Sequence, residues 1–101
     1  MAELDPVLHH PARIAIATRL AIDERLRFTA LREATGLTPG NLASHLAAME
    51  KAGYVAQRDA IIRLRPGKLV ALTDAGRAAL AAYAAQLEAL LDELKLAKRN
   101  G

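Results

Sequence analysis

The sequence has no cysteine and no tryptophan, and its aromatic residues are limited to Phe28, Tyr54 and Tyr83. Without cysteine the chain can form no disulfide, no thiolate metal site and no thiol redox sensor. The composition is 52% hydrophobic, but much of that fraction is alanine. So few large side chains predict a thin, helical core that a partner subunit could complete.

Long hydrophobic runs are also missing. No stretch approaches the ~20 apolar residues of a membrane span. The opening MAELDPVLHHPAR lacks the basic segment and hydrophobic core of a signal peptide. We therefore expect no membrane association and a cytoplasmic location. A chain of 101 residues makes one small domain, without room for a deep enzyme cleft and a separate regulatory domain.

Groups that perform catalysis are scarce. Ser44 is the single serine, and no cysteine can replace it as a nucleophile. The carboxylate pairs Asp23-Glu24 and Asp92-Glu93, like Asp74, lie where helix caps and solvated helix faces explain them. We predict that the chain is not an enzyme and holds no cofactor.

Metal ligands are nearly absent as well. His9 and His10 are adjacent and close to Asp5, but neighbouring histidines on a helix point in different directions and no second cluster completes a ligand set. A helix cap or an interface contact explains either histidine better. We expect no metal site.

The segment 28–54 predicts two short helices joined by a tight turn. Thr38 is a good N-cap for the second helix, Pro39 suits its first position, and Gly53 can supply the left-handed residue that ends it. This helix should therefore span residues 39–52. Such a pair is typical of a helix-turn-helix that reads DNA.

The second helix of this pair has two distinct faces. Its apolar positions recur at spacings of four and three and should pack inward: Leu42, Leu46 and Met49. The other face presents Asn41, Ser44, His45 and Ala48. Asn can pair with adenine, Ser and His can donate to bases or phosphates, and small Ala48 allows close approach to a groove wall. Alone, this face could equally be a solvated surface.

Two neighbouring segments support the interpretation that the helix at 39–52 reads DNA. Thr29 can cap a short helix at 30–35, followed by a turn at Gly36-Leu37. Helices this short need a third one to pack on, and residues 11–22, opened by Pro11, supply it. These three helices should form the core of the domain.

After Gly53 the pattern changes to that of a β-hairpin with a basic tip. Residues 54–58 and 69–72 read as strands, with Pro66-Gly67 between them. The segment carries four cations and one carboxylate, Asp59, so its net charge is 4 − 1 = +3. This equals the net charge of the whole chain. This hairpin should meet phosphates, although a solvated loop is the alternative. The cations are Arg58, Arg63, Arg65 and Lys68.

A long last helix should follow at about residues 74–97, capped by Thr73 and opened by Asp74. Its apolar residues recur close to heptad spacing. We expect this seam to pack against the same helix of a second subunit, although a helix folded back on its own domain is the alternative. The basic tail 95–101 should fray. The seam consists of Leu80, Tyr83, Leu87, Leu90, Leu91 and Leu94.

Several motifs resemble the short winged-helix DNA-binding regulators related to the MarR and ArsR groups. They are GLTPGNLASHLAAMEKAGYV at 36–55, the pair Arg65-Pro66, LTDAGRAAL at 72–80 and the opening HHPARIAIATRL. The likeness covers nearly the whole chain. It implies a mainly α (α+β) fold: a three-helix core, a two-stranded wing and a long C-terminal helix. It also implies a homodimeric, cytoplasmic prokaryotic regulator that binds double-stranded DNA.

In this resemblance the first and last helices dimerise, helix three enters the major groove, and the wing meets the minor groove or the backbone. Where family members often carry a cation in helix three, this chain has Ala47 and Ala48, and its wing includes Asp59 and Leu64. We therefore expect weaker or more salt-sensitive binding than in a typical relative. The DNA-binding set is Thr38, Pro39, Asn41, Ser44, His45, Lys51, Arg58, Arg63, Arg65 and Lys68.

Two questions stay open at this level. A winged helix can also serve as a protein-interaction module without specific DNA binding, and the missing cations keep this alternative. A small-molecule effector could lie between the dimer helices and the core, but no polar cluster in an apolar setting marks its pocket.

Overall fold

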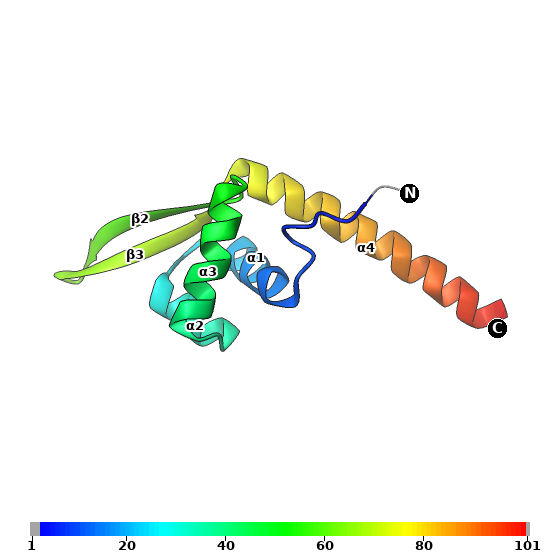
Figure 1. Cartoon of the computed structure of the whole chain (residues 1–101), viewed down its shortest axis with the longest axis horizontal. Coiled ribbons are helices and arrows are strands. Elements are labelled where there is room, and N and C mark those ends of the chain that lie inside the picture. Colours follow the sequence, from blue (N-terminus) through cyan, green and yellow to red (C-terminus); the bar gives the residue numbers. More distant parts are fainter. Residues whose placement is uncertain (1–2, 101) are drawn as a thin grey trace.

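The computed structural model describes residues 3–100. Three helices form the centre of the molecule, a β-hairpin extends from one side and a long helix from the other (Figure 1), giving extents of 60 × 24 × 21 Å. No helix in this range is long and apolar enough to cross a membrane. The elements are α1 (Pro11–Asp23), β1 (Arg25–Arg27), α2 (Phe28–Thr35), α3 (Pro39–Lys51), β2 (Val55–Ile62), β3 (Arg65–Leu72) and α4 (Asp74–Asn100).

The core lies where α1, α2 and α3 meet the base of the sheet. The predicted inward stripe of α3 is confirmed, since all three of its residues have no exposed surface. Burial of this apolar surface holds together helices that would not be stable alone. The buried core residues are Leu8, Ile16, Ala17, Leu20, Leu31, Leu42, Leu46, Met49, Val55, Val70, Leu72 and Tyr83.

The ends of α3 follow the sequence signals. The Asn41 backbone N–H donates to Thr38 Oγ1 at 3.1 Å, so Thr38 is the N-cap. Gly53 has a φ of 81°, the left-handed geometry expected after the helix. Both predictions are confirmed, and the last helical residue, Lys51, lies one position before the expected end.

The start of α2 was predicted wrongly. The helix begins at Phe28, and Arg27 occupies the N-cap position without a side-chain hydrogen bond. Thr29 therefore lies inside the first turn and caps nothing. The reason is β1, which pairs with β3 as far as Arg27↔Leu69 and runs directly into the helix.

The sheet has three strands in the order β1-β3-β2, all antiparallel, whereas the sequence predicted only the hairpin. β1 is three residues long, too short to show a period of its own. It exists because Leu26, paired with Val70, packs against the core.

The hairpin is longer than predicted and turns elsewhere. Its strands cover residues 55–62 and 65–72, and the turn is at Arg63-Leu64, with φ of 51° and 67°. Pro66 and Gly67 lie inside β3, so they are not the tip. Because β1 ends opposite Leu69, one side of β3 has no partner strand at Pro66, and a residue without an N–H is tolerated there.

The start of α4 is fastened to the corner between α3 and β2. Thr73 Oγ1 accepts from the Gly76 N–H at 3.0 Å, which confirms the predicted cap, and donates to the Gly53 carbonyl at 2.5 Å. A Cβ on Gly76 would lie 2.0 Å from the Tyr54 carbonyl oxygen, so the helix crosses at a distance that only glycine permits. α4 stays helical to Asn100, and the predicted fraying before that residue is wrong. Gly101 lies outside the described residues.

Candidate nucleic-acid interface

The exposed face of α3 carries mostly small side chains, with Lys51 as a long cation at its last turn. Ser44 and Lys51 lie nearest its centre, opposite the buried stripe, and Asn41 and Ala47 flank them. Thr38 and Pro39 are exposed at the helix start. The helix is therefore slim on this side and can approach another surface closely.

His45 does not project from this face as the sequence suggested. It is half-buried, its Nδ1 accepts from Arg13 Nε at 3.0 Å, and its ring centroid lies 4.6 Å from that of His10. Burial, then the nearby His10 and Arg13, lower the pKa of His45. The correction has a physical reason: His45 ties α3 to the start of α1, where His10 also caps the helix by accepting from the Ala12 N–H at 3.3 Å.

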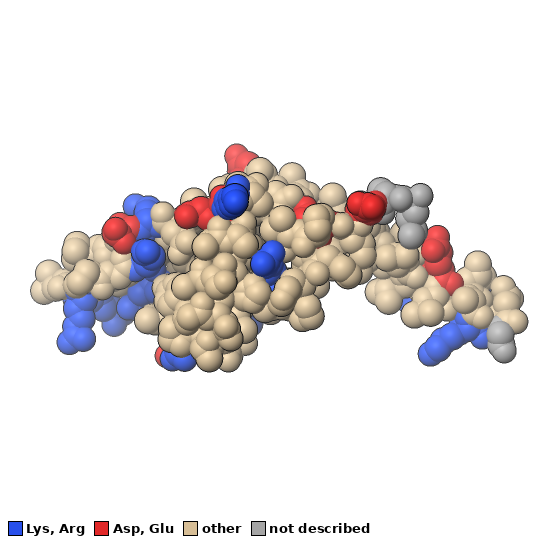
Figure 2. Space-filling view, viewed as in Figure 1, with Lys and Arg blue, Asp and Glu red and all other residues tan. Residues whose placement is uncertain are grey.

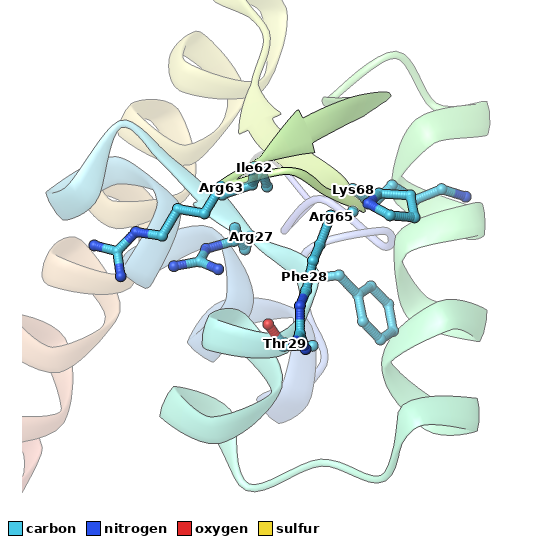
Figure 3. A pocket seen from close by; sticks show the side chains of 9 residues that line it. Arg27, Phe28, Thr29, Ile62, Arg63, Arg65 and Lys68 are labelled. Atoms are coloured by element: carbon cyan, nitrogen blue, oxygen red, sulfur yellow. The ribbon is translucent and has the colours of Figure 1, made fainter.

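The wing and the start of α2 enclose a hollow of about 330 Å³ with four cations in its lining. In Figure 3, Arg63 and Arg27 point to one side of the hairpin, Arg65 points toward Thr29, and Lys68 points toward α3. The predicted wing residues Arg63, Arg65 and Lys68 thus line one hollow, while their charged ends point to different sides of it. The hollow lies beside the start of a helix whose first N–H groups favour anions.

Arg27 was missed from the sequence, and Arg58 lies away from the tip. The register places Arg27, Leu69 and Arg58 in one row across the three strands, and Arg25 follows on the same face because side chains alternate along a strand. No signal in the sequence reveals this strand, because its three residues are too few to show an alternating pattern. Lys68 directly precedes Leu69 and therefore lies on the opposite face, so basic side chains occupy both faces of the hairpin.

These cations are not neutralised within the fold. The one ion pair in the described part of the chain joins Arg19 and Asp23, at 3.6 Å. Asp59 is the partner of Lys68 in the register, yet the two do not form an ion pair. Figure 2 shows Lys and Arg gathered over the wing at one end of the molecule and again near the free end of α4.

The predicted seam of α4 divides into two parts. Tyr83 is 2% exposed, and its hydroxyl lies 2.7 Å from His9 Nδ1, so it belongs to the chain's own core and is unavailable to a second subunit. Leu80 and Leu87 also pack against this core. The reason is the N-terminal segment 3–10, which lies along α4 (Figure 1).

That segment is held by Asp5. The Val7 and Leu8 N–H groups donate to its Oδ1 at 2.8 and 3.2 Å, and the Tyr54 hydroxyl donates to Oδ2. Burial would raise the pKa of Asp5, but these hydrogen bonds outweigh it and the pKa lies below its ordinary value. The bond to Asp5 also raises the pKa of Tyr54.

Beyond this segment the outer half of α4 is bare. All of residues 91–100 are exposed, among them Leu91 at 53% and Leu94 and Leu96 at 58% each. A groove of about 600 Å³ between the N-terminal segment and α4 includes Leu4 and Leu90 in its lining. Leu94 follows Leu90 by about one helical turn, so the exposed leucines begin next to this groove.

Comparison with known proteins identifies the family to which this fold belongs. A profile described as a winged helix DNA-binding domain matches residues 12–91. The chain belongs to this family. Its members are DNA-binding regulators and not enzymes, and the predicted winged-helix class is thereby confirmed.

Individual relatives agree. A transcriptional regulator homologue from Pyrococcus horikoshii OT3 is 32% identical, with 87% of each chain covered and a TM-score of 0.83. An uncharacterized protein from Methanocaldococcus jannaschii is 31% identical over 77 residues, 76% of this winged-helix chain and 84% of that protein. A MarR-family regulator from Silicibacter pomeroyi shares the fold at 22% identity and a TM-score of 0.66, covering 87% of this chain and 58% of that one.

Proposed function

We propose that this winged-helix protein is a homodimeric transcriptional regulator that binds a specific sequence in double-stranded DNA. The recognition helix α3 would enter the major groove, where Asn41 and Ser44 reach base edges and the small Ala47 permits close approach. The wing would meet the backbone or the minor groove beside it.

The observation that carries this proposal is the cluster of unpaired cations around the hollow between the wing and α2. Arg27, Arg63, Arg65 and Lys68 lie together there, and no carboxylate lies within ion-pair distance of them in the described fold. Like charges gathered without counter-charges raise the local potential, which favours a phosphate backbone. A protein-interaction module has no use for such a cluster, because most protein partners would leave it desolvated and unpaired.

Dimerisation through α4 is the second part of the proposal. The projecting half of this helix has no support within the chain, and helices in water need packing to be stable. Its exposed leucines lie next to a groove lined by Leu4, Ala89 and Leu90 and by the polar Glu3, His9, Gln86 and Glu93, and a second α4 would cover both. This proximity favours a second subunit over a small-molecule effector as the occupant of the groove.

The deciding measurement is fluorescence anisotropy with duplexes that flank the protein's own gene, over a salt series, against a random duplex. We expect binding at least about a hundredfold tighter to the native flank. The variant Arg63→Ala/Arg65→Ala should lower affinity about a hundredfold and reduce the salt slope by roughly 0.9 for each lost phosphate contact.

The matched control is Arg19→Ala/Arg77→Ala, which removes the same charge from α1 and α4. It should bind DNA nearly as well as the parent, because neither residue lies near the wing. Equal, weak binding of the parent to both duplexes would favour the interaction module. An unimpaired Arg63→Ala/Arg65→Ala variant would remove the wing from the DNA interface.

A further inference from the structure

The outermost residue of the wing is apolar. Leu64 is 95% exposed and Ile61 is 73% exposed, the two highest values among the large apolar side chains that the structure describes. Arg63 and Leu64 form the two-residue turn between the paired residues Ile62 and Arg65. Leu64 therefore makes no substantial contact within its own chain.

Leucine is unfavourable at this position for two reasons. Its φ of 67° lies in the left-handed region, which is costly for a residue with a branched side chain, and turns with two positive φ values favour Asn-Gly. Its apolar surface also remains in water. Since no contact in the described fold offsets either cost, the position is best explained by a contact outside the chain.

The neighbours of Leu64 indicate what that contact is. Arg63 and Arg65 are both exposed on either side of it. A second copy of this chain would bring the same cations against them, and an apolar protein surface would leave them unpaired. The minor groove of DNA suits this arrangement, because its negative potential attracts arginine while its sugars and base edges accept an apolar side chain.

The hairpin has the reach for this contact. Eight residue pairs join its strands, from Val55↔Leu72 to Ile62↔Arg65, so the hairpin is roughly 25 Å long at about 3.3 Å per residue, and its outer part projects beyond the end of β1 opposite Leu69. Lys68 points toward α3, whereas Arg27 and Arg63 point the other way (Figure 3). Cations on both sides of the hairpin match the two phosphate strands that border one groove.

We propose that Leu64 enters the minor groove as an apolar contact between Arg63 and Arg65. This inference rests on the proposed DNA-binding function and adds an apolar component to the wing. It predicts a preference for A·T pairs at the wing position, because guanine places an amino group on the floor of the minor groove.

The test compares the parent with Leu64→Asn on the native-flank duplex. Asparagine accepts the left-handed turn, so the melting temperature should stay the same or rise. Affinity should fall about tenfold as the apolar contact is lost. The salt slope should not change, because no charge is removed.

A second duplex, with 2,6-diaminopurine in place of adenine, sharpens the test. This base adds an amino group in the minor groove and keeps adenine's major-groove pattern, so α3 should still read it. The parent should lose more affinity on this duplex than Leu64→Asn does. Ile22→Asn, which changes a residue 65% exposed on α1, is the matched control and should bind like the parent.

Three results would overturn the inference. Leu64→Asn could bind within about twofold of the parent, both proteins could lose the same factor on the diaminopurine duplex, or Leu64→Asn could lower the mass of the assembly, which would assign Leu64 to a contact between copies. Failure of the proposed DNA-binding function would give a different result, because the parent itself would then show no preference for the native-flank duplex over the random duplex.

Discussion

The wing and the outer half of α4 both project from the core, in opposite directions (Figure 1), and they expose different chemistry. The wing is a hydrogen-bonded ladder that exposes the cations Arg58, Arg63, Arg65 and Lys68 together with the apolar Ile61 and Leu64. The end of α4 satisfies its own backbone and exposes leucines beside the groove that it forms with the N-terminal segment. Each projection exposes side chains that its own chain does not cover, and we propose phosphates as the partner of the wing and a second copy of the chain as the partner of α4.

The two projections share one joint, where β2 leaves α3 and α4 begins. Replacing Gly76 there should have the largest effect of any single change. In Gly76→Ala the Cβ would lie 2.0 Å from the Tyr54 carbonyl oxygen, and α4 would have to move. We expect the free energy of unfolding to fall by about 3 kcal/mol, measured by urea denaturation.

Gly40→Ala is the control for this prediction. A Cβ at Gly40 meets nothing within 4 Å, so the variant should be as stable as the parent or gain up to about 1 kcal/mol. Equal stability of Gly76→Ala and the parent would show that the crossing of α4 over Tyr54 is looser than the structure has it.

A charged substitution on α4 tests the proposed dimer contact of this helix. Leu94 and Leu96 are equally exposed, at 58% each, but helical spacing places Leu94 in the stripe with Leu87 and Leu91 and Leu96 on the other side. Leu94→Glu should weaken dimerisation about a hundredfold, because each subunit then places a charge in the interface. Light scattering over a dilution series measures this.

Leu96→Glu should leave the mass unchanged at the same concentrations. A parent that is monomeric at micromolar concentration would remove the proposed dimer altogether. Equal losses in both variants would mean that the interface is not confined to one stripe.

Removing the hydrogen bond between Tyr54 and Asp5, which ties the N-terminal segment to the start of β2, should lower stability by a smaller amount. Tyr54→Phe removes the hydrogen bond to Asp5 and should lower the free energy of unfolding by about 1 kcal/mol. Because the folded pKa of Asp5 is depressed, this contribution is present above its ordinary pKa and is lost as pH falls through the folded value. The difference in unfolding free energy between the variant and the parent, measured by denaturation, should therefore be full at pH 7 and shrink as the pH falls below the ordinary pKa of Asp5.

Tyr83→Phe is the matched control, since it removes the hydroxyl that contacts His9 and leaves Asp5 alone. Its effect should not vanish at low pH with that of Tyr54→Phe. Parallel pH dependence in the two variants would contradict the role assigned to Asp5.

The smallest effect is expected where α3 meets α1. The folded pKa of His45 is lowered, so the unfolded chain binds more protons just below the ordinary histidine pKa of about 6.5. Stability should be complete above that value and decline as pH falls through the folded value. His45→Gln should flatten this decline in melting temperature, and Arg13→Gln should flatten it in part. Identical slopes in parent and His45→Gln would exclude His45 as its source.

Local signals predicted much of this fold from the sequence. Thr38 and Thr73 cap their helices as expected, Gly53 ends α3, and the stripe of α3 is buried, because caps, left-handed glycines and helical periodicity act over a few residues. The turn of the wing was placed wrongly at Pro66-Gly67. Its position at Arg63-Leu64 depends on how two strands pair, and no turn residue marks it.

The candidate site divides in the same way. The exposure of Asn41, Ser44 and Lys51 follows from helical spacing. Arg27 joins the basic hollow only because β1 pairs with β3, and His45 leaves the exposed face because α1 brings Arg13 to it. Neither contact has a signal in the spacing of its own segment.

The sequence by itself determined the existence of the helices, the caps of α3 and α4, the basic hairpin and the winged-helix class, since these depend on local propensity and periodic burial. Only the tertiary structure decided that a third strand forms and that the wing turns at Arg63-Leu64. It also decided the contact between Tyr83 and His9 and the division of α4 into a covered half and an exposed half. Those features depend on contacts between residues far apart in the chain, which form only when the whole core packs.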